Sequence, residues 1–152
     1  MSILCGVDFS PGSLKALDVA CGLAVESGAD VTALHTIAWP WDEPPAPDFD
    51  KMAPEQAFAL QEYRRYLEAG ATTRLRNLLT ERGCSVDRAS VVVRHGSAHV
   101  EILQEARERE ADLIVLGAQG RGPFDLALFG STANQVVRQA SCPVWIARKS
   151  RG

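Results

Sequence analysis

The sequence predicts an α/β fold, a three-layer sandwich built on a parallel β-sheet. Short apolar runs alternate with helical patterns along all 152 residues, and this alternation is typical of parallel strands joined by crossover helices. Asp8, Thr36 and Gly117 each lie where a predicted strand ends, and ligands of such sheets bind at the carboxyl ends of the strands. The length favours one domain over residues 1–152.

The first third of the chain has the pattern strand, helix, strand. Residues 3–7 form a short apolar run, and residues 31–37 form a second one. Between them, Ser10 followed by Pro11 is typical of a helix N-cap and first helical position. Gly28 is expected to end this helix, whose apolar face comprises Leu14, Leu17, Cys21 and Ala24.

Residues 38–54 interrupt the alternation, because proline and acidic residues dominate them. Prolines exclude a central strand or an uninterrupted helix here. The segment is either an exposed connection or a flap over the pocket, with Trp39 or Trp41 packing near a bound base. The sequence leaves both open.

The second half resumes the alternation with a long helix over residues 55–82, ended by Gly83. Its expected packing face comprises Leu60, Tyr63, Leu67, Ala71 and Leu78, with Gly70 allowing close packing. Further strands are expected at residues 89–94, 113–116 and 143–147, and a further helix at 98–110 with Ser97 as a plausible cap.

A glycine-containing loop separates the strand at 113–116 from the last helix. Gly117, Gly120 and Gly122 lie in it, and Gly130 closes it. Ser131 or Thr132 can cap the helix that follows, whose apolar face comprises Ala133, Val136, Val137 and Ala140. Glycines let backbone N–H groups face a ligand, and a helix N-terminus adds positive partial charge. Because neither GxxxxGK[ST] nor a GxGxxG after the first strand is present, the loop predicts a phosphate site of another kind.

Three charged residues accompany this site. Asp8 can accept two hydrogen bonds from a ribose diol, or it can be a capping acid for the helix that follows. Arg121, inside the loop, either offsets phosphate charge or is merely solvated. Asp125 either reaches a metal through water or is solvated. The three histidines fit no metal-site spacing.

Composition excludes several classes of function. A net charge of −3 and a pI near 5.6 argue against a nucleic-acid surface. No apolar run approaches the roughly 20 residues of a membrane span, and the N-terminus has no basic region typical of a signal peptide. The four cysteines form no CxxC pair. They are expected to be free thiols in a reducing cytosol, which predicts a cytoplasmic protein.

The sequence resembles the universal stress proteins of the nucleotide-binding type, nearly from end to end. The loop spacing of Gly117, Gly120, Gly130 and Ser131 matches that of the ATP-binding members. The other matching stretches are Val7-Asp8-Phe9-Ser10, the LHTI of residues 34–37, His95-Gly96, the DLIVLG of residues 112–117, and Cys142-Pro143-Val144.

This resemblance implies a Rossmann-like sheet of five parallel strands in the order 3-2-1-4-5, similar to the adenine nucleotide alpha hydrolases. It also implies a homodimer and ATP bound with Mg²⁺ or Mn²⁺. Asp8 would contact the ribose and Thr36 the adenine, through its backbone. Leu116 and Gly117 would line the sugar, and the phosphates would be held by Gly120, Gly130, Ser131 and Thr132. Ala118-Gln119 departs from the pattern, since relatives often carry a small hydroxyl residue and a basic residue or histidine there.

If residues 144–147 form the sheet edge, unpaired backbone groups there favour pairing with a second copy. The favoured function is an ATP-binding regulatory module whose occupied state a partner protein reads. A slow ATPase or a nucleotide-dependent transferase is the first alternative, although no base is placed to activate water. An interaction protein of the same fold that has lost nucleotide binding is the second.

Overall fold

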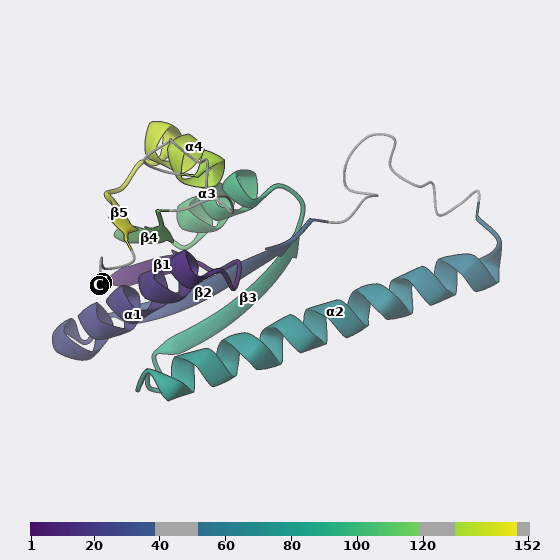
Figure 1. Ribbon diagram of the computed structural model, residues 1–152, viewed down its shortest axis with the longest axis horizontal. Helices are drawn as coiled ribbons and strands as arrows, with labels where there is room; N and C mark the ends of the chain where they lie inside the picture. The colour runs from purple at the N-terminus through teal and green to yellow at the C-terminus, as the bar shows by residue number, and fades with distance from the viewer. Residues whose placement is uncertain (39–51, 119–129, 149–152) are drawn as a thin grey trace.

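The computed structural model describes residues 1–38, 52–118 and 130–148. Five parallel strands form one sheet in the order β3-β2-β1-β4-β5, which confirms the expected order (Figure 1). The strands are β1 (Ser2–Gly6), β2 (Asp30–Ile37), β3 (Ala89–His95), β4 (Leu113–Gly117) and β5 (Val144–Ala147). The helices are α1 (Pro11–Ser27), α2 (Pro54–Glu81), α3 (Ala98–Glu108) and α4 (Ser131–Gln139).

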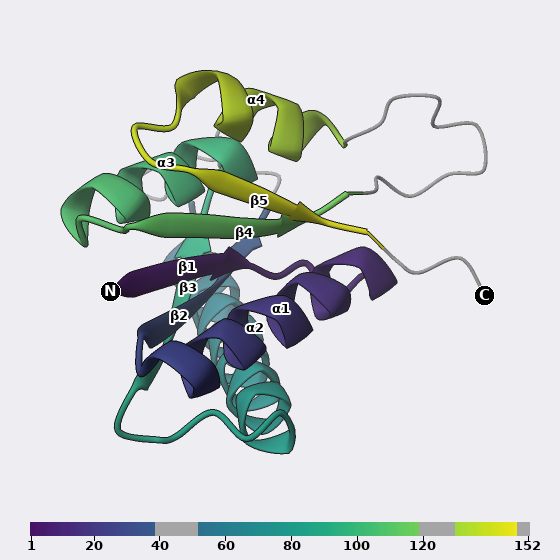
Figure 2. The same cartoon turned by 90° about the vertical axis from the view of Figure 1, so that its left-hand side faces the viewer.

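Helices cover both faces of the sheet, so the strands are buried on two sides. Figure 2 shows α3 and α4 on one face and α1 and α2 on the other. Successive strand residues point to opposite faces: Ile3 and Cys5 of β1 join the core under α1 and α2, whereas Leu4 joins the core under α3 and α4. Two apolar layers flanking one sheet make the predicted three-layer sandwich.

The ends of α1 follow the sequence prediction. Ser10 is the N-cap and its hydroxyl accepts a hydrogen bond from the Ser13 N–H, while Pro11 occupies the first helical position. Gly28 ends the helix with a φ of 75°, a left-handed conformation that glycine adopts without steric cost. The sequence prediction is therefore confirmed at both ends of α1.

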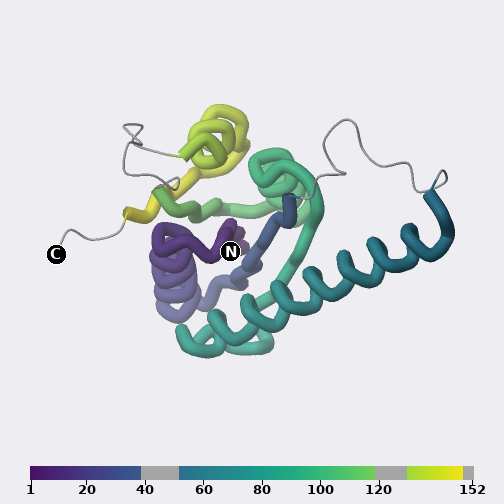
Figure 3. Tube along the Cα trace, turned by 45° about the vertical axis from the view of Figure 1, so that its right-hand side comes forward, coloured from purple at the N-terminus to yellow at the C-terminus, as the bar shows by residue number. Residues whose placement is uncertain are grey.

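Helix α2 is longer than the sheet it covers. Figures 1 and 3 show its N-terminal half extending past the strands, and Leu75 and Leu79 are its buried residues. The expected packing face is therefore wrong at Tyr63, which is 49% exposed. A Cβ added at Gly70 would have no neighbouring atom within 4 Å, so the expected close packing there is also wrong. Tyr63 belongs to the half of α2 that extends past the strands, whereas Gly70 belongs to the other half, at a position that faces no neighbouring atoms.

Helix α4 begins one residue earlier than a cap at Ser131 would place it, and two residues earlier than a cap at Thr132 would. Gly130 is the N-cap, and no side chain of the described residues caps the helix. Ser131 and Thr132 are already helical, so the expectation that one of them caps α4 is wrong. Val137 is 48% exposed, against the expected apolar face, because α4 buries only a narrow stripe through Ala133 and Val136.

Two further findings concern the described residues as a whole. None of the described helices is both long and apolar enough to cross a membrane. All four cysteines are free thiols.

Candidate functional site

A cavity of about 150 Å³ lies at the carboxyl ends of β1, β2 and β4. Seven of the nine residues that the sequence analysis assigned to a nucleotide site line it. They are Asp8, Thr36, Leu116, Gly117, Gly130, Ser131 and Thr132. The other two, Gly120 and Arg121, lie outside the described residues, as do Asp125 and the two tryptophans of the possible flap.

The N-termini of three helices converge on this cavity. Ser10 and Ser13 line it from α1, Ala98 from α3, and Ser131 from α4. Helix N-termini present N–H groups without intrahelical partners and carry positive partial charge. Within the described part of the chain no side chain caps α4, so no described side chain competes with a ligand for its first N–H groups. The electrostatics of the cavity therefore favour an anion.

The end of β4 packs unusually close to the start of α1. A Cβ on Gly117 would lie 2.5 Å from the carbonyl carbon of Gly12 and 2.7 Å from the Ser13 nitrogen. Real Cβ atoms do not approach backbone atoms so closely, so only glycine fits at the end of this strand. The close approach brings the first turn of α1 against the cavity.

A tight turn after β1 directs the Asp8 side chain. The Ser10 N–H donates to Asp8 Oδ1 at 2.9 Å, and the Ser10 hydroxyl bonds to the same oxygen. The Asp8 N–H in turn donates to Ser13 Oγ at 3.2 Å. Because Ser10 is the N-cap of α1, Asp8 is not the capping residue of that helix. Its carboxylate is exposed and borders the cavity.

Thr36 supplies a polar atom that lacks a partner. Its Oγ1 is buried and has no hydrogen-bond partner within the described part of the chain. A buried hydroxyl left unpaired costs free energy, so a group that enters the cavity and bonds to it would relieve that cost. The sequence predicted a backbone role for Thr36 and gave no sign of this hydroxyl.

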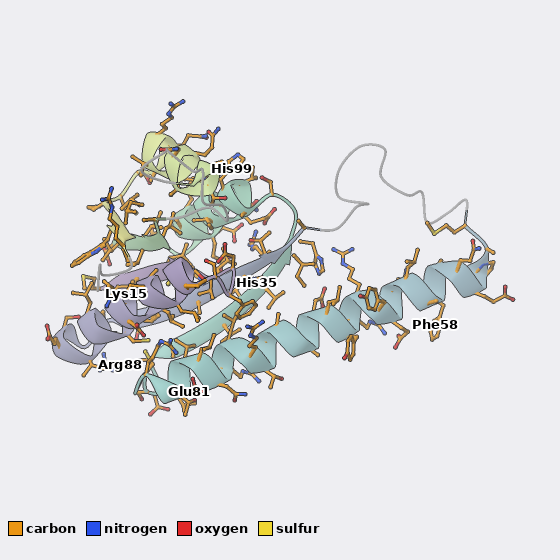
Figure 4. The ribbon with its side chains drawn as sticks, in the orientation of Figure 1. Lys15, His35, Phe58, Glu81, Arg88 and His99 are labelled. Atoms are coloured by element: carbon orange, nitrogen blue, oxygen red, sulfur yellow. The ribbon has the colours of Figure 1, made fainter. Side chains whose placement is uncertain are left out.

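The turn that carries Asp8 is held on the opposite face of the sheet by an aromatic stack. Phe9 adopts a φ of 64°, and its ring lies 4.6 Å from the His35 ring, centroid to centroid. The Arg74 guanidinium carbon lies 4.0 Å above the Phe9 ring. Figure 4 shows His35 between the sheet and α2.

The environment of His35 favours its neutral form. Burial, the largest cause, lowers the pKa of His35, while a hydrogen bond to the Val7 carbonyl and the charge of Asp8 oppose the shift. Neutral His35 donates from Nδ1 to the Val7 oxygen at 2.7 Å. That bond joins β2 to the last residue before Asp8.

Other polar groups lie away from the cavity. His95 bonds through Nε2 to Glu68 of α2, and His99 bonds through Nδ1 to the Ser97 hydroxyl at 3.1 Å. Ser97 occupies the N-cap position of α3, but its hydroxyl caps no backbone N–H. Within residues 1–38, 52–118 and 130–148, no three His, Cys, Asp or Glu side chains gather into a metal site.

Several lining residues were not assigned to the site from the sequence, among them Ser10, Ser13, Ala98 and Ile102. Ser10 and Ser13 could have been assigned to the site from the sequence. Ser10 is the predicted N-cap of the helix that follows Asp8, so the first turn of that helix lies at the same edge of the sheet as Asp8. No local pattern marks Ala98 or Ile102, since they reach the cavity only through the packing of α3 on the sheet.

The chain belongs to the universal stress protein family, whose family model matches residues 1–148. A universal stress protein of Methanocaldococcus jannaschii is 28% identical over 150 residues, which cover 98% of this chain and 82% of that protein. An uncharacterized protein of Schizosaccharomyces pombe is 29% identical over 94% of this chain, but the chain spans only 22% of its length.

Solved structures show the same fold. The universal stress protein UspA of Lactobacillus plantarum matches with a TM-score of 0.76 and 27% identity, over 97% of both chains. A universal stress protein in complex with cAMP matches with a TM-score of 0.69 and 20% identity, over 99% of this chain and 98% of that one. An Arabidopsis thaliana family member with AMP bound matches with a TM-score of 0.64 and 16% identity, over 99% and 92%.

Proposed function

We propose that the cavity at the ends of β1, β2 and β4 binds an adenine nucleotide, ATP in the first place. The supporting observation is that seven residues assigned to a nucleotide site from the sequence, and the N-termini of α1, α3 and α4, meet at this cavity. Structures of two family members contain cAMP and AMP, which supports an adenine nucleotide as the ligand class. The glycine spacing of the loop supports bound phosphate, and it resembles the spacing of the ATP-binding members of the family.

The described residues suit the parts of that ligand. The Asp8 carboxylate can accept hydrogen bonds from the ribose, and the unpaired Thr36 hydroxyl can bond to the base or the sugar. The N–H groups of Ser131 and Thr132 at the uncapped start of α4 suit phosphate oxygens. Mg²⁺ or Mn²⁺ bound with the triphosphate would offset part of its charge.

Regulation through occupancy is favoured over catalysis. Among the described residues that line the cavity, Asp8 is the only ionisable side chain, and its predicted partner is the ribose. A base placed to activate water against a γ-phosphate is therefore not part of the described lining. Hence we propose a binding module whose occupied state a partner protein reads, with slow hydrolysis or group transfer as the alternative.

The same proposal includes a homodimer formed through β5. This strand ends the sheet, pairing only with β4 among the described strands, and Trp145 on it is 46% exposed. An edge strand with an exposed aromatic residue favours pairing with another copy. If the unaltered protein folds and dimerises but binds no nucleotide, that result would support the alternative of an interaction protein that has lost nucleotide binding.

Calorimetric titration of the purified protein with ATP and Mg²⁺ tests the proposal. Asp8→Asn keeps Oδ1 as the acceptor for the Ser10 N–H but removes the charge, so ATP affinity should fall about 10- to 100-fold with the melting temperature nearly unchanged. Asp30→Asn is the matched control, because Asp30 is an exposed carboxylate at the opposite end of the sheet. No binding by the unaltered protein, or equal binding by both variants, would reject the site.

A further inference from the structure

One residue beside the cavity has a backbone conformation that its side chain disfavours. Phe9 has a φ of 64°, in the left-handed region that bulky residues rarely occupy. Its neighbours Asp8 and Ser10 both line the cavity, whereas Phe9 itself does not. Such a strained position persists only where the surroundings hold it, and it is often found next to a functional site.

Two contacts from other elements hold Phe9. Its ring packs on His35 of β2 with an interplanar angle of 44°, and the Arg74 guanidinium of α2 lies over the ring at 4.0 Å. A cation over an aromatic face is attracted by the ring's quadrupole. Phe9 also packs against the apolar core beneath α1 and α2, so its ring lies on the face of the sheet away from α3 and α4.

Arg74 lies in the part of α2 that is packed against the sheet. It precedes Leu75, which is fully buried and anchors α2 to the sheet. The half of α2 that carries Arg74 is thus the half that packs on the sheet, not the half that extends past it (Figure 1). The ring of Phe9 is held between this anchored turn and His35.

The conformation of Phe9 and the direction of the Asp8 carboxylate are linked through the turn that follows β1. A peptide that turns left-handed at Phe9 brings the Ser10 N–H and hydroxyl back onto Asp8 Oδ1. If Phe9 relaxed to a right-handed or extended conformation, this turn would open and Asp8 would lose its place at the cavity. Phe9 thus links packing contacts beneath α1 and α2 to a residue that lines the cavity.

We propose that Phe9 is a positioning residue of the nucleotide site, held in its left-handed conformation by Arg74 of α2 and His35 of β2 so that Asp8 faces the ribose. This inference rests on the proposed function of the cavity. Phe9 and Arg74 touch no nucleotide; they act through Asp8. The predicted signature is a loss of selectivity for the ribose hydroxyls, which a general loss of stability would not produce.

The test compares the affinities for ATP and 2′-deoxy-ATP in matched variants. Arg74→Ala and Phe9→Leu remove the cation–ring contact, and each should weaken ATP binding about 3- to 10-fold. The preference for ATP over 2′-deoxy-ATP should fall towards one in the same variants. Arg74→Lys and Phe9→Tyr keep a cation and a ring, and they should restore most of both quantities.

Arg76→Ala is the control, because Arg76 is an exposed arginine on another side of the same helix. A second measurement needs no nucleotide: the Ser10 N–H, bonded to Asp8 Oδ1, should exchange with solvent faster in Arg74→Ala than in Arg76→Ala. Equal exchange rates and unchanged ribose selectivity in Arg74→Ala would overturn the inference. Failure of the unaltered protein to bind ATP would instead reject the proposed function, while the exchange rates would still decide whether Arg74 holds the turn.

Discussion

Replacing Gly117 by alanine should destabilise the whole domain, because the added methyl group has no space. It would lie 2.5 Å from the Gly12 carbonyl carbon and 2.7 Å from both the Gly12 oxygen and the Ser13 nitrogen. Ordinary contacts need about 3.5 Å or more, so the first turn of α1 would have to move by roughly 1 Å. All three neighbours are backbone atoms, so no side-chain rotation relieves the clash.

Overpacking of this kind costs about 1–3 kcal/mol, and the rigid neighbours favour the upper end of that range. At roughly 2–4 °C per kcal/mol for a domain of this size, Gly117→Ala should melt about 6–12 °C below the unaltered protein. Differential scanning calorimetry without ligand measures this directly. Because Ser10 and Ser13 line the cavity, the displaced turn should also weaken nucleotide binding.

Gly22→Ala provides the control. Gly22 lies in the middle of α1 with nothing within 4 Å of its would-be Cβ, so alanine should stabilise the helix by about 0.5–1 kcal/mol. The two substitutions make the same chemical change with opposite expected signs. A melting temperature for Gly117→Ala within about 1 °C of the unaltered protein would refute the close approach of α1 to β4.

Three further predictions concern other parts of the structure. The folded-state pKa of His35 lies below its ordinary value, so the unfolded chain binds more protons as the pH falls below about 6.5 and stability should decrease there. Between pH 7.5 and 5.5 the melting temperature of His35→Asn should fall less than that of the unaltered protein. An equal fall would show that His35 does not cause the loss of stability. Trp145→Lys should weaken dimerisation at least tenfold in sedimentation experiments. Val86→Lys, at an 85% exposed site on a loop, is the control and should leave dimerisation unchanged. An unaltered protein that is monomeric at micromolar concentration would refute the β5 interface. Arg94 pairs with Glu105 at 2.8 Å, and the Glu105 side chain is only 6% exposed. Arg94→Ala should therefore cost about 2–3 kcal/mol, less than the usual 3–5 for a broken buried pair because Arg109 still contacts Glu105. If the melting temperature of Arg94→Ala differs from that of the unaltered protein by less than about 2 °C, the Arg94–Glu105 pair does not contribute to stability.

The sequence predicted the fold well because the relevant signals are local. Each strand is an apolar run with clear ends, and the caps at Ser10 and Gly28 depend only on neighbouring residues. The expected caps of α4, Ser131 or Thr132, were wrong by one or two positions, since Gly130, Ser131 and Thr132 all fit a cap by residue type. Only the backbone decides among them.

The site was predicted in part, for a similar reason. Strand ends are visible in the sequence, so Asp8, Thr36 and Gly117 could be assigned to one edge of the sheet. Contacts between distant segments have no such signal: the sequence explained Gly117 by an exposed N–H, whereas the structure shows a close approach to α1. The stack of Arg74 on Phe9 likewise joins residues that only the packing of α2 brings together.

The strand order has a consequence for the synthesis of the protein. The first strand made, β1, lies in the centre of the sheet, and its second neighbour, β4, begins only at Leu113. During translation β1, β2 and β3 can pair before β4 has been made, so one edge of β1 is still unpaired at that stage. The pairing of β1 with β4 joins segments that are far apart in the sequence, and such pairing is slow. The wall of the cavity that α4 supplies forms only after residues 131–139 have been made, so the proposed nucleotide site is complete only once this helix has folded.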